Sequence, residues 1–515
     1  MTLLLELVIL LPLMLGLRLA GGCMLQQFKG VSQELDVVSL CRNTVLAVCL
    51  ILLLHIFLVP GAAGQVNSFT WLELGSLKLG LDIYIGGFHI WLALLFSVLV
   101  FVSFHFSASY LHRERGFFRF HAVLCFFHFA MLLLVLSGSA VFTFIAWEVA
   151  GICSWLLIAY NFGNSRITAN ATRVMIVQRC GDAMFLMGIA LMLLWLGTDQ
   201  WGSISQSTSG LSELQLTVVS CSFVGAALVK SAQVPFTPWL YRAMEGPTPS
   251  SAVFYGGVMV HAGVYLLILI QDLLEQAPFA MLLLLVFGFA TVVYGVLVGR
   301  TQADIKSSMA SAAAVQIGLM FMECGLGWWT LAAWHLAGHA VMRSYVFLRT
   351  PSILHNAHNL PVKPLSASSR WLQQAALQQF WLDELMDKSV SRPVVTLATD
   401  ITYFEDHVLD PLMGVPAPVV SSISNLAQAR EQSIGARLDD EADTFARGSG
   451  LAGQLTALVA GISHWFEERF ILQGVGRDII SLGRRLGHAA NRFEQLLLRP
   501  RYMVLFVLIT VLVAL

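Results

Sequence analysis

The stretch VFTFIAWEVAGICSWLLIAY at 141–160 decides the fold class, because it is apolar and long enough to cross a bilayer yet carries Glu148. A second such stretch, VVSCSFVGAALVKSAQVPF at 218–236, holds Lys230. A charge at the bilayer centre costs roughly 2.5–3.5 kcal/mol, so it rarely faces lipid. We therefore expect the two charges to lie inside a helical bundle, either as a relay for protons or other cations or as a static salt bridge that fixes helix packing.

The composition of the whole chain is that of a membrane protein. Of its 515 residues, 57% are hydrophobic and 12% are charged, whereas soluble domains are typically about 25% charged. The net charge of −1 gives no reason to expect nucleic-acid binding. The eight cysteines form no CxxC pair, so the sequence predicts neither a disulfide framework nor a zinc site.

Apolar runs predict an all-α polytopic membrane protein with about 12 transmembrane helices, some of them broken. We place these helices at 2–21, 40–59, 88–108, 118–137, 139–160, 171–196, 215–234, 250–271, 278–299, 303–323, 327–349 and 500–515. The first run lacks a basic segment before it, so we expect it to be retained rather than cleaved. Turn and strand residues in 66–85 predict a short external hairpin.

Four parts of the chain follow from this pattern. Residues 1–104 hold the first helices and the hairpin, 105–350 form a conducting core, 351–499 form an amphipathic helical tail, and 500–515 anchor the C-terminal end. Basic residues gather in alternate links between helices: Lys29, Arg42, Arg113, Arg115, Arg119, Arg166, Arg173, Arg242, Arg300 and Lys306. The positive-inside rule then places the tail in the cytoplasm and both termini outside, which suits a bacterial inner membrane.

The tail contains a loose repeat of an aromatic residue, an acid and apolar residues one turn later. It occurs as WLDELMDKSV at 381, YFEDHVLDPLMG at 403, WFEERFILQGVG at 465 and RFEQLLLRP at 492. This pattern is typical of amphipathic helices that lie along a membrane surface or against the bundle. A small soluble helical domain is the alternative.

Prolines follow Lys230 closely, because Pro235 and Pro238 lie within two turns of it. Proline removes a backbone donor and ends a helix. Transporters use such broken helices beside a charge, since the freed carbonyls line a hydrated cavity. The sequence therefore predicts that the helix breaks beside Lys230, where the prolines follow.

Two histidines, His335 and His339, lie one turn apart in LAAWHLAGHAVMRSYVFL, and Arg343 follows one turn later. Neutral imidazole passes protons near pH 7, so we expect a proton relay here. Two core histidines bonded to the backbone are one alternative. A membrane metalloenzyme is another, but the HExxH pattern is missing, since Leu336 follows the first histidine, and no nearby cysteine or acid completes a metal site. We expect no metal, no cofactor and no catalysis by this chain.

The segment AMEGPTPSSAVFYGGVMVHAG at 243–263 places Glu245 before a proline-marked turn, with Tyr255 and His261 on the helix that follows. We expect His261 to be the middle link between Lys230 and the later histidines. Two further pairs near helix ends are expected to orient helices rather than to conduct: Arg179 with Asp182, and Asp304 with Lys306.

Several of these stretches resemble the antiporter-like family of respiratory complex I and Mrp-type cation antiporters. They are FIAWEVAGICSWLLI, QRCGDAMFLMGI, KSAQVPFTPWLYRAMEGPTPSSA, ADIKSSMASAAAVQIGLM and HLAGHAVMRSYVFL, which occur in order between about 105 and 350. The tail strings FWLDELMDKSVSRPVVTLA and YFEDHVLDPL are similar to the C-terminal region of the largest such complex I subunit (NuoL-type). The resemblance implies that Glu148 and Lys230 stand for the family's carboxylate–lysine pair, and His335 and His339 for its central histidines.

The chain departs from the family at Arg343, where a lysine is usual, and at 250–255, where Ser-Ser-Ala-Val-Phe-Tyr replaces Val-Ser-Ala-Leu-Ile-His. The family's late lysine-bearing helix also has no counterpart after 350. The motifs GPTPSSAVFYGG and RPRY (499–502) resemble those of the DabB-type branch. That branch pairs with a peripheral cytoplasmic zinc protein related to β-carbonic anhydrases (DabA-type) in inorganic-carbon accumulation.

The resemblance thus implies a subunit that couples a proton or cation gradient to a peripheral zinc partner, with membrane lipid as its surroundings. A subunit of complex I or of an Mrp-type antiporter is the alternative within transport. A structural scaffold, whose buried charges only hold helices together, is the alternative outside it. The residues leave the coupling ion open between H⁺ and Na⁺.

Overall fold

A computed structural model describes residues 2–24, 32–59, 61, 64–74, 77–204, 208, 210–302, 304–349 and 370–404. The chain divides into two compact units, 1–393 and 394–515. The described part of the second unit is the end of a single helix, α19 (Arg392–Phe404). The tail repeats at 465 and 492, most of the repeat at 403, and the expected anchor at 500–515 lie outside the described residues.

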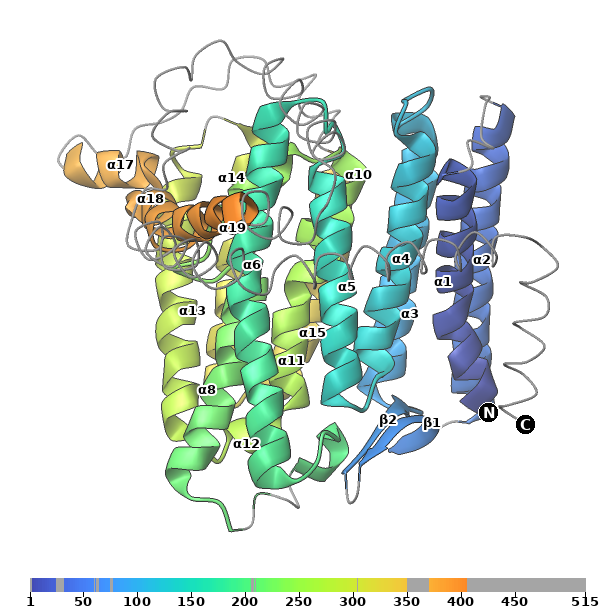
Figure 1. Ribbon diagram of the computed structural model, residues 1–515, viewed down its shortest axis with the longest axis horizontal. Coiled ribbons are helices and arrows are strands. Elements are labelled where there is room, and N and C mark those ends of the chain that lie inside the picture. The colour runs from blue at the N-terminus through green and yellow to red at the C-terminus, as the bar shows by residue number, and fades with distance from the viewer. Residues whose placement is uncertain are drawn as a thin grey trace, which may run out of the picture. The chain divides into compact units, whose positions relative to one another are not determined.

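Ten helical segments of the described residues are long and apolar enough to cross a membrane, which confirms the prediction of a helical polytopic protein (Figure 1). They are α1 (Thr2–Met24), α2 (Ser32–Leu58), α3 (Phe88–Tyr110), α4 (Phe117–Leu136), α5 (Ala140–Ile158), α6 (Ser165–Leu191) with the π turn Met192–Leu196, α8 (Glu213–Lys230), the segment Thr248–Leu269, α13 (Pro278–Gly299) and α14 (Ile305–Gly325).

The span expected at 327–349 forms a helix but is not among the ten segments apolar enough to cross a membrane. This helix, α15 (Trp329–Leu348), carries His335, His339 and Arg343, which lower its hydropathy. The remaining helices are short: Trp201–Ser203, α9 (Pro238–Arg242), Ala243–Glu245, α12 (Gln271–Leu274), α17 (Arg370–Leu377), Gln379–Trp381, α18 (Leu382–Met386) and Asp387–Ser391.

Side-chain caps explain where several of the long helices begin. The Ser139 hydroxyl accepts from the first turn of α5, and the Asn164 amide oxygen does the same for α6. Ser212 and Gln215 form a reciprocal capping box at the start of α8. Each cap satisfies backbone N–H groups that have no partner within the helix, so these starts are encoded locally.

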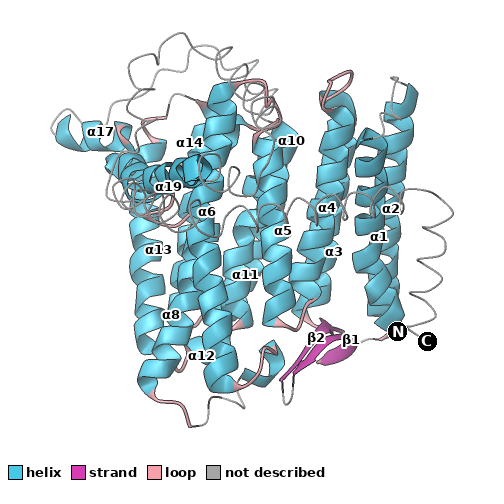
Figure 2. Ribbon diagram, in the orientation of Figure 1, coloured by secondary structure: helices cyan, strands magenta, loops and turns pink. Residues whose placement is uncertain are grey.

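The hairpin predicted for 66–85 is present as β1 (Gln65–Leu74) and β2 (Leu77–Tyr84), shown in magenta in Figure 2. The strands are antiparallel, with Gln65 opposite Tyr84. An isolated bridge joins Ile83 to Ser137, and the Gly138 amide donates to the Asp82 carbonyl at 2.7 Å. The hairpin therefore lies against the turn between α4 and α5.

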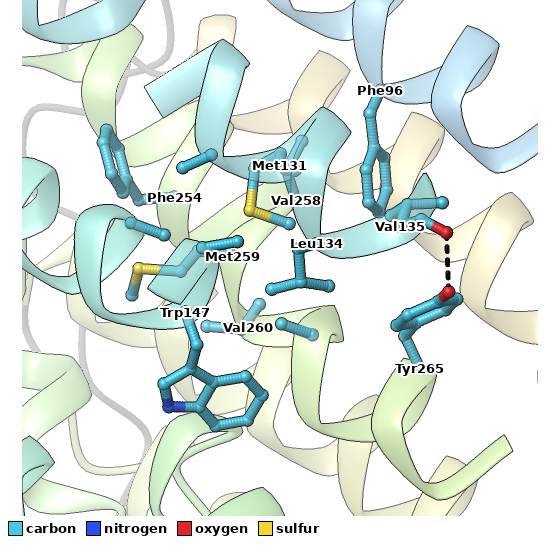
Figure 3. Close-up of a cluster of buried hydrophobic side chains, with 14 of the residues drawn as sticks. Phe96, Met131, Leu134, Val135, Trp147, Phe254, Val258, Met259, Val260 and Tyr265 are labelled. Carbon is cyan, nitrogen blue, oxygen red and sulfur yellow. Dashed lines mark hydrogen bonds between the residues drawn. The ribbon is translucent and has the colours of Figure 1, made fainter. Parts of the chain in front are cut away.

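Figure 3 shows part of the buried apolar core of the first unit, with Trp147 at the edge of the residues drawn. Phe96 of α3, Met131 of α4 and Phe254 of the broken segment belong to this core and are fully buried. The Trp147 indole is also buried and lies edge to face with Phe185, with ring centres 5.1 Å apart. This matters because Trp147 contacts the charged residues described below.

Two broken helices meet beside this core. The helix α8 ends at Lys230, before the expected end at 234, which places the predicted break at Lys230 itself. The segment Thr248–Leu269 is broken into α10 (Thr248–Ser251), a π turn (Ala252–Gly257), a 3-10 turn (Met259–His261) and α11 (Ala262–Leu269). The Ser231 hydroxyl donates to the Val260 carbonyl at 2.7 Å. A Cβ at Gly263 would lie 2.6 Å from the Ala227 carbonyl oxygen, so glycine permits this close approach.

Candidate functional site

Lys230 is buried, with 1% of its surface exposed, and it is the last residue of α8. Its ammonium donates to the Trp147 carbonyl at 2.9 Å and lies 4.9 Å from the centre of a Trp147 ring. Among the described residues, the ammonium has no carboxylate within 4 Å. The alternative of a direct Glu148–Lys230 salt bridge is therefore wrong.

Glu148 instead pairs with Arg179 of α6, whose other terminal nitrogen lies 2.8 Å from Asp182. The second Asp182 oxygen accepts from the Trp147 indole N–H at 2.8 Å. Glu148, Arg179, Asp182, Trp147 and Lys230 thus form a continuous row of contacts, which we call the ionic row. Arg179 and Asp182 were predicted only to orient helices, whereas the structure places them between the two predicted charges.

Gly151 of α5 lets the two cations of the ionic row approach each other. A Cβ on this glycine would lie 3.3 Å from a terminal nitrogen of Arg179 and 3.4 Å from the Lys230 ammonium. The Glu148 side chain is 21% exposed and that of Asp182 is 6% exposed. The row therefore leads from a partly accessible carboxylate to a buried ammonium. Arginine keeps its proton, so Arg179 conveys charge between the carboxylates without being able to carry a proton.

His261 and His339 are in direct contact, with Nε2 of the first 2.8 Å from Nδ1 of the second. Arg343 donates from Nε to the other His339 nitrogen at 3.3 Å. Because that nitrogen accepts, the neutral His339 ring carries its proton on Nδ1 and donates it to His261. His261 then carries its own proton on Nδ1, which is buried and has no hydrogen-bond partner in the part of the chain that the structure describes.

His335 lies beside this pair, with its ring centre 6.2 Å from that of His339. Its Nδ1 is 2.8 Å from Glu323 and its Nε2 is 3.1 Å from the Gln316 side-chain oxygen. From the sequence alone, no acid completes a site with the two histidines, and the structure adds Glu323 as a partner of His335. Sequence reasoning missed Glu323, which stands at the end of the apolar run 303–323.

The supporting residues occupy separate places. The Tyr255 hydroxyl is 3.0 Å from that of Ser154 on α5, so its hydrogen-bond partner is not one of the histidines. Glu245 accepts from Asn170 at 3.2 Å near the surface. The expected Asp304–Lys306 pair does not form: Asp304 caps α14, and Lys306 donates to the Gly246 carbonyl at 3.2 Å. Lys306 is thereby tied to the turn that carries Glu245.

The described residues contain no group of three or more histidine, cysteine, aspartate or glutamate side chains that could hold a metal ion. The geometry instead presents titratable groups in two clusters. The ionic row lies on α5, α6 and α8, and the histidine pair lies on the broken segment and α15. The Ser231–Val260 hydrogen bond joins the residue after Lys230 to the residue before His261.

The protein-family comparison matches residues 137–373 to the family described as NADH:quinone oxidoreductase/Mrp antiporter, TM. NADH-quinone oxidoreductase subunit L of Rickettsia typhi is 31% identical over 308 residues, which are 58% of this chain and 47% of that protein. The subunit L of Campylobacter jejuni is 34% identical, covering 53% of this chain and 46% of its own. The chain thus spans about half the length of these relatives.

Solved structures agree with these relatives. The Mrp complex from Dietzia sp. DQ12-45-1b contains a chain with a TM-score of 0.58 and 25% identity, over 67% of this chain and 36% of that one. The archaeal membrane-bound sulfane sulfur reductase contains a chain with a TM-score of 0.58 and 18% identity, over 75% of this chain and 82% of that one. The second likeness shows a common fold alone.

Proposed function

We propose that the chain is an antiporter-like membrane subunit of the complex I and Mrp type, because its residues 137–373 match that family, and that it translocates protons as one subunit of a heteromeric membrane complex. The observation that carries the proposal is the ionic row. It places Glu148, Arg179, Asp182 and Lys230 in contact with one another or through Trp147, inside helices apolar enough to span a membrane.

The ionic row supports proton transfer because its charges depend on one another. When Glu148 takes up a proton, it becomes neutral and its ion pair with Arg179 is lost. Arg179 then shifts towards Asp182. A fully paired Asp182 attracts the Lys230 ammonium less, so Lys230 releases its proton more readily. Arg179 returns when Glu148 loses its proton. A scaffold needs no such sequence, and buried ion pairs are weak stabilisers.

The histidine pair is the proposed acceptor beyond Lys230. The Ser231–Val260 hydrogen bond brings the broken end of α8 to the turn that holds His261. From His261 the proton reaches His339 across 2.8 Å, and the neighbouring His335 is held by Glu323. Arg343 keeps its proton and fixes which His339 nitrogen accepts, so it is a positioning residue in this scheme.

For the parent complex, the named relatives favour an antiporter-like subunit of a complex I or Mrp type. Energised inorganic-carbon accumulation with a DabA-type zinc partner is the second candidate. Two observations favour it. One is the sequence motif GPTPSSAVFYGG. The other is that Arg343, which bonds His339, stands where the family usually has a lysine. In both cases we propose a bacterial inner membrane, with the Arg-rich links and the tail on the cytoplasmic side.

Two measurements test the proposed function. Purified complex is placed in liposomes, and a potassium diffusion potential makes their interior negative. Protons should then move inward through the complex, and a pH dye inside the liposomes should report them. No dye response above that of empty liposomes would contradict proton translocation. Copurification in mild detergent then separates the parent complexes: several antiporter-like neighbours support the complex I or Mrp type, and a stoichiometric zinc protein supports the inorganic-carbon type.

A further inference from the structure

A second row of buried polar groups lies between α3 and α4, and the proton path described above does not use it. His121 and His128 are seven residues apart on α4, so they lie on one face of that helix, two turns apart. Neither imidazole has any exposed surface. Each contacts a serine of α3, which we take together as the α3–α4 row.

The contacts of these histidines are specific. His121 lies 2.8 Å from the Phe117 carbonyl through Nδ1 and 3.1 Å from the Ser107 hydroxyl through Nε2. A carbonyl only accepts, so Nδ1 of His121 carries a proton. His128 lies 3.0 Å from the Ser97 hydroxyl through Nε2, and Ser97 also donates to the Ala93 carbonyl at 2.8 Å.

Two polar atoms between α3 and α4 have no hydrogen-bond partner among the described residues. They are Nδ1 of His128 and the hydroxyl of Ser103, and both are buried. Ser103 lies on α3 between the two serines that contact the histidines. An unpaired buried polar group costs about 1–3 kcal/mol, so helix packing alone favours apolar side chains at these places. Both atoms are instead suited to hydrogen-bond buried water.

Polar groups also mark both ends of the α3–α4 row. Beyond the end of α3, the His112 side chain is 49% exposed and lies 2.9 Å from Glu34. At the start of α3, His89 lies 2.8 Å from the Tyr265 hydroxyl, which donates to the Val135 carbonyl of α4 (Figure 3). His89 also stacks on Tyr84 of the hairpin, with ring centres 3.7 Å apart.

The serines of the α3–α4 row, Ser97 and Ser107, are about 15 Å apart on a helix that is itself long enough to cross a membrane. The helix α3 has 23 residues, which at 1.5 Å per residue is about 35 Å, and the hydrocarbon core of a bilayer is about 30 Å. Imidazole and hydroxyl groups therefore recur from one end of a spanning helix to the other. Packing against α4 hides them from lipid over this distance.

We propose that the α3–α4 interface is a second, hydrated proton route, which connects the Glu34–His112 end to the His89 end and runs beside the ionic row. It rests on the proposed function in that the chain moves protons. At His128 a proton arrives on one ring nitrogen and the proton of the other nitrogen leaves to water, whereas at His121, whose Nδ1 proton is held by the Phe117 carbonyl, the proton enters and leaves through Nε2; each ring returns to its neutral form. The serine hydroxyls accept and donate in the same way, without a net change of charge.

The first test measures hydration without measuring transport. In D2O the Cε1–H of a histidine exchanges only if the ring meets water and is transiently protonated, and the mass of proteolytic peptides reports this exchange. In the intact complex we expect His121 and His128 to exchange within roughly tenfold of their rates in the unfolded chain. Rates slowed by roughly a hundredfold or more, or no exchange at all, would overturn the proposal whether or not the complex moves protons.

The second test uses proton flux in liposomes. His128→Gln keeps an N–H donor for Ser97 but cannot relay a proton. In the Lys230→Ala complex, which lacks the ammonium at the end of the ionic row, we expect a residual flux that His128→Gln removes. His105→Gln is the control, because His105 is an exposed histidine of α3, the helix that packs against α4. A Lys230→Ala complex with no residual flux, or a residual flux that survives His128→Gln, would overturn the second route.

Discussion

At the scale of the residue, Arg179 is the part of the ionic row that connects the rest. It bonds Glu148 with one terminal nitrogen and lies 2.8 Å from Asp182 with the other. Only a planar, permanently charged group serves two carboxylates in this way. Lys230 depends on it indirectly, because the Asp182 carboxylate that Arg179 shares also accepts from the Trp147 indole.

We expect Arg179→Gln to lower proton flux by roughly tenfold, because Glu148 and Asp182 lose the shared cation that couples them. Arg179→Lys should retain part of the flux, since one charge-assisted pair remains. Arg166→Gln is the control on the same helix, because the Arg166 side chain is 83% exposed and 3.8 Å from Glu245. Equal flux in the Arg179→Gln and Arg166→Gln complexes would refute the coupling role.

Among the histidine contacts, His339→Ala should reduce flux by roughly tenfold or more, since methyl cannot relay a proton. Arg343→Lys should reduce it by less than about threefold, because lysine keeps the charge and an N–H donor beside His339. The comparison uses the liposome dye assay with both variants at equal protein density. The reverse order would show that the guanidinium itself, rather than the imidazole, is essential.

The sequence predicted the residues of the site better than their partners. Glu148, Lys230 and the histidines stood out because each is polar inside an apolar run. Arg179 and Asp182 did not, since their three-residue spacing is equally typical of a pair that stabilises its own helix. Glu323 became significant only when folding brought α14 beside His335.

At the scale of the element, the two helix breaks place the site. Pro235 and Pro238 made the break after Lys230 predictable. The second break, at Ala252–His261, consists of a π turn and a 3-10 turn that hydrophobicity does not reveal. Its position depends on tertiary contacts, such as the Ser231–Val260 hydrogen bond and the close approach at Gly263.

Gly263→Val should disturb this contact, because its Cβ would lie 2.6 Å from the Ala227 carbonyl oxygen. Overpacking of this kind typically destabilises by about 1–3 kcal/mol. We therefore expect a lower thermal midpoint in detergent and a reduced flux. Gly338→Val on α15 is the matched control, since nothing lies within 4 Å of its Cβ position. Equal midpoints for the two variants would contradict the close packing of α8 and α11.

At the scale of the whole molecule, the first unit includes the start of the predicted tail. Arg242 binds Asp383 through two bonds of 2.7 and 2.5 Å, and Arg173 lies 3.3 Å from Asp387. Asp383 and Asp387 are thus the acids of the first tail repeat that contact the bundle. Glu384 pairs with Lys388 of its own helix and is 54% exposed. The amphipathic pattern predicted a helix with a contact face, but could not tell which acids lie on it.

Asp383→Lys combined with Asp387→Lys should detach this segment from the bundle, because both changes place a cation against Arg242 and Arg173. We expect faster cleavage within 379–391 by a protease added to the membranes, while membrane insertion stays unchanged. Glu384→Lys is the control for a charge reversal on the outward side. Cleavage of the double variant at the parental rate would show that the ion pairs do not hold the segment.

The central claim is that the ionic row carries protons, and proton flux through Lys230→Ala complexes in liposomes tests it most directly. Lys306→Gln is the control, because Lys306 donates to backbone carbonyls at the Glu245 turn and lies outside the row. We predict at least a roughly threefold fall for Lys230→Ala and near-parental flux for Lys306→Gln, at equal amounts of intact complex. Parental flux through the Lys230→Ala complex would contradict the account.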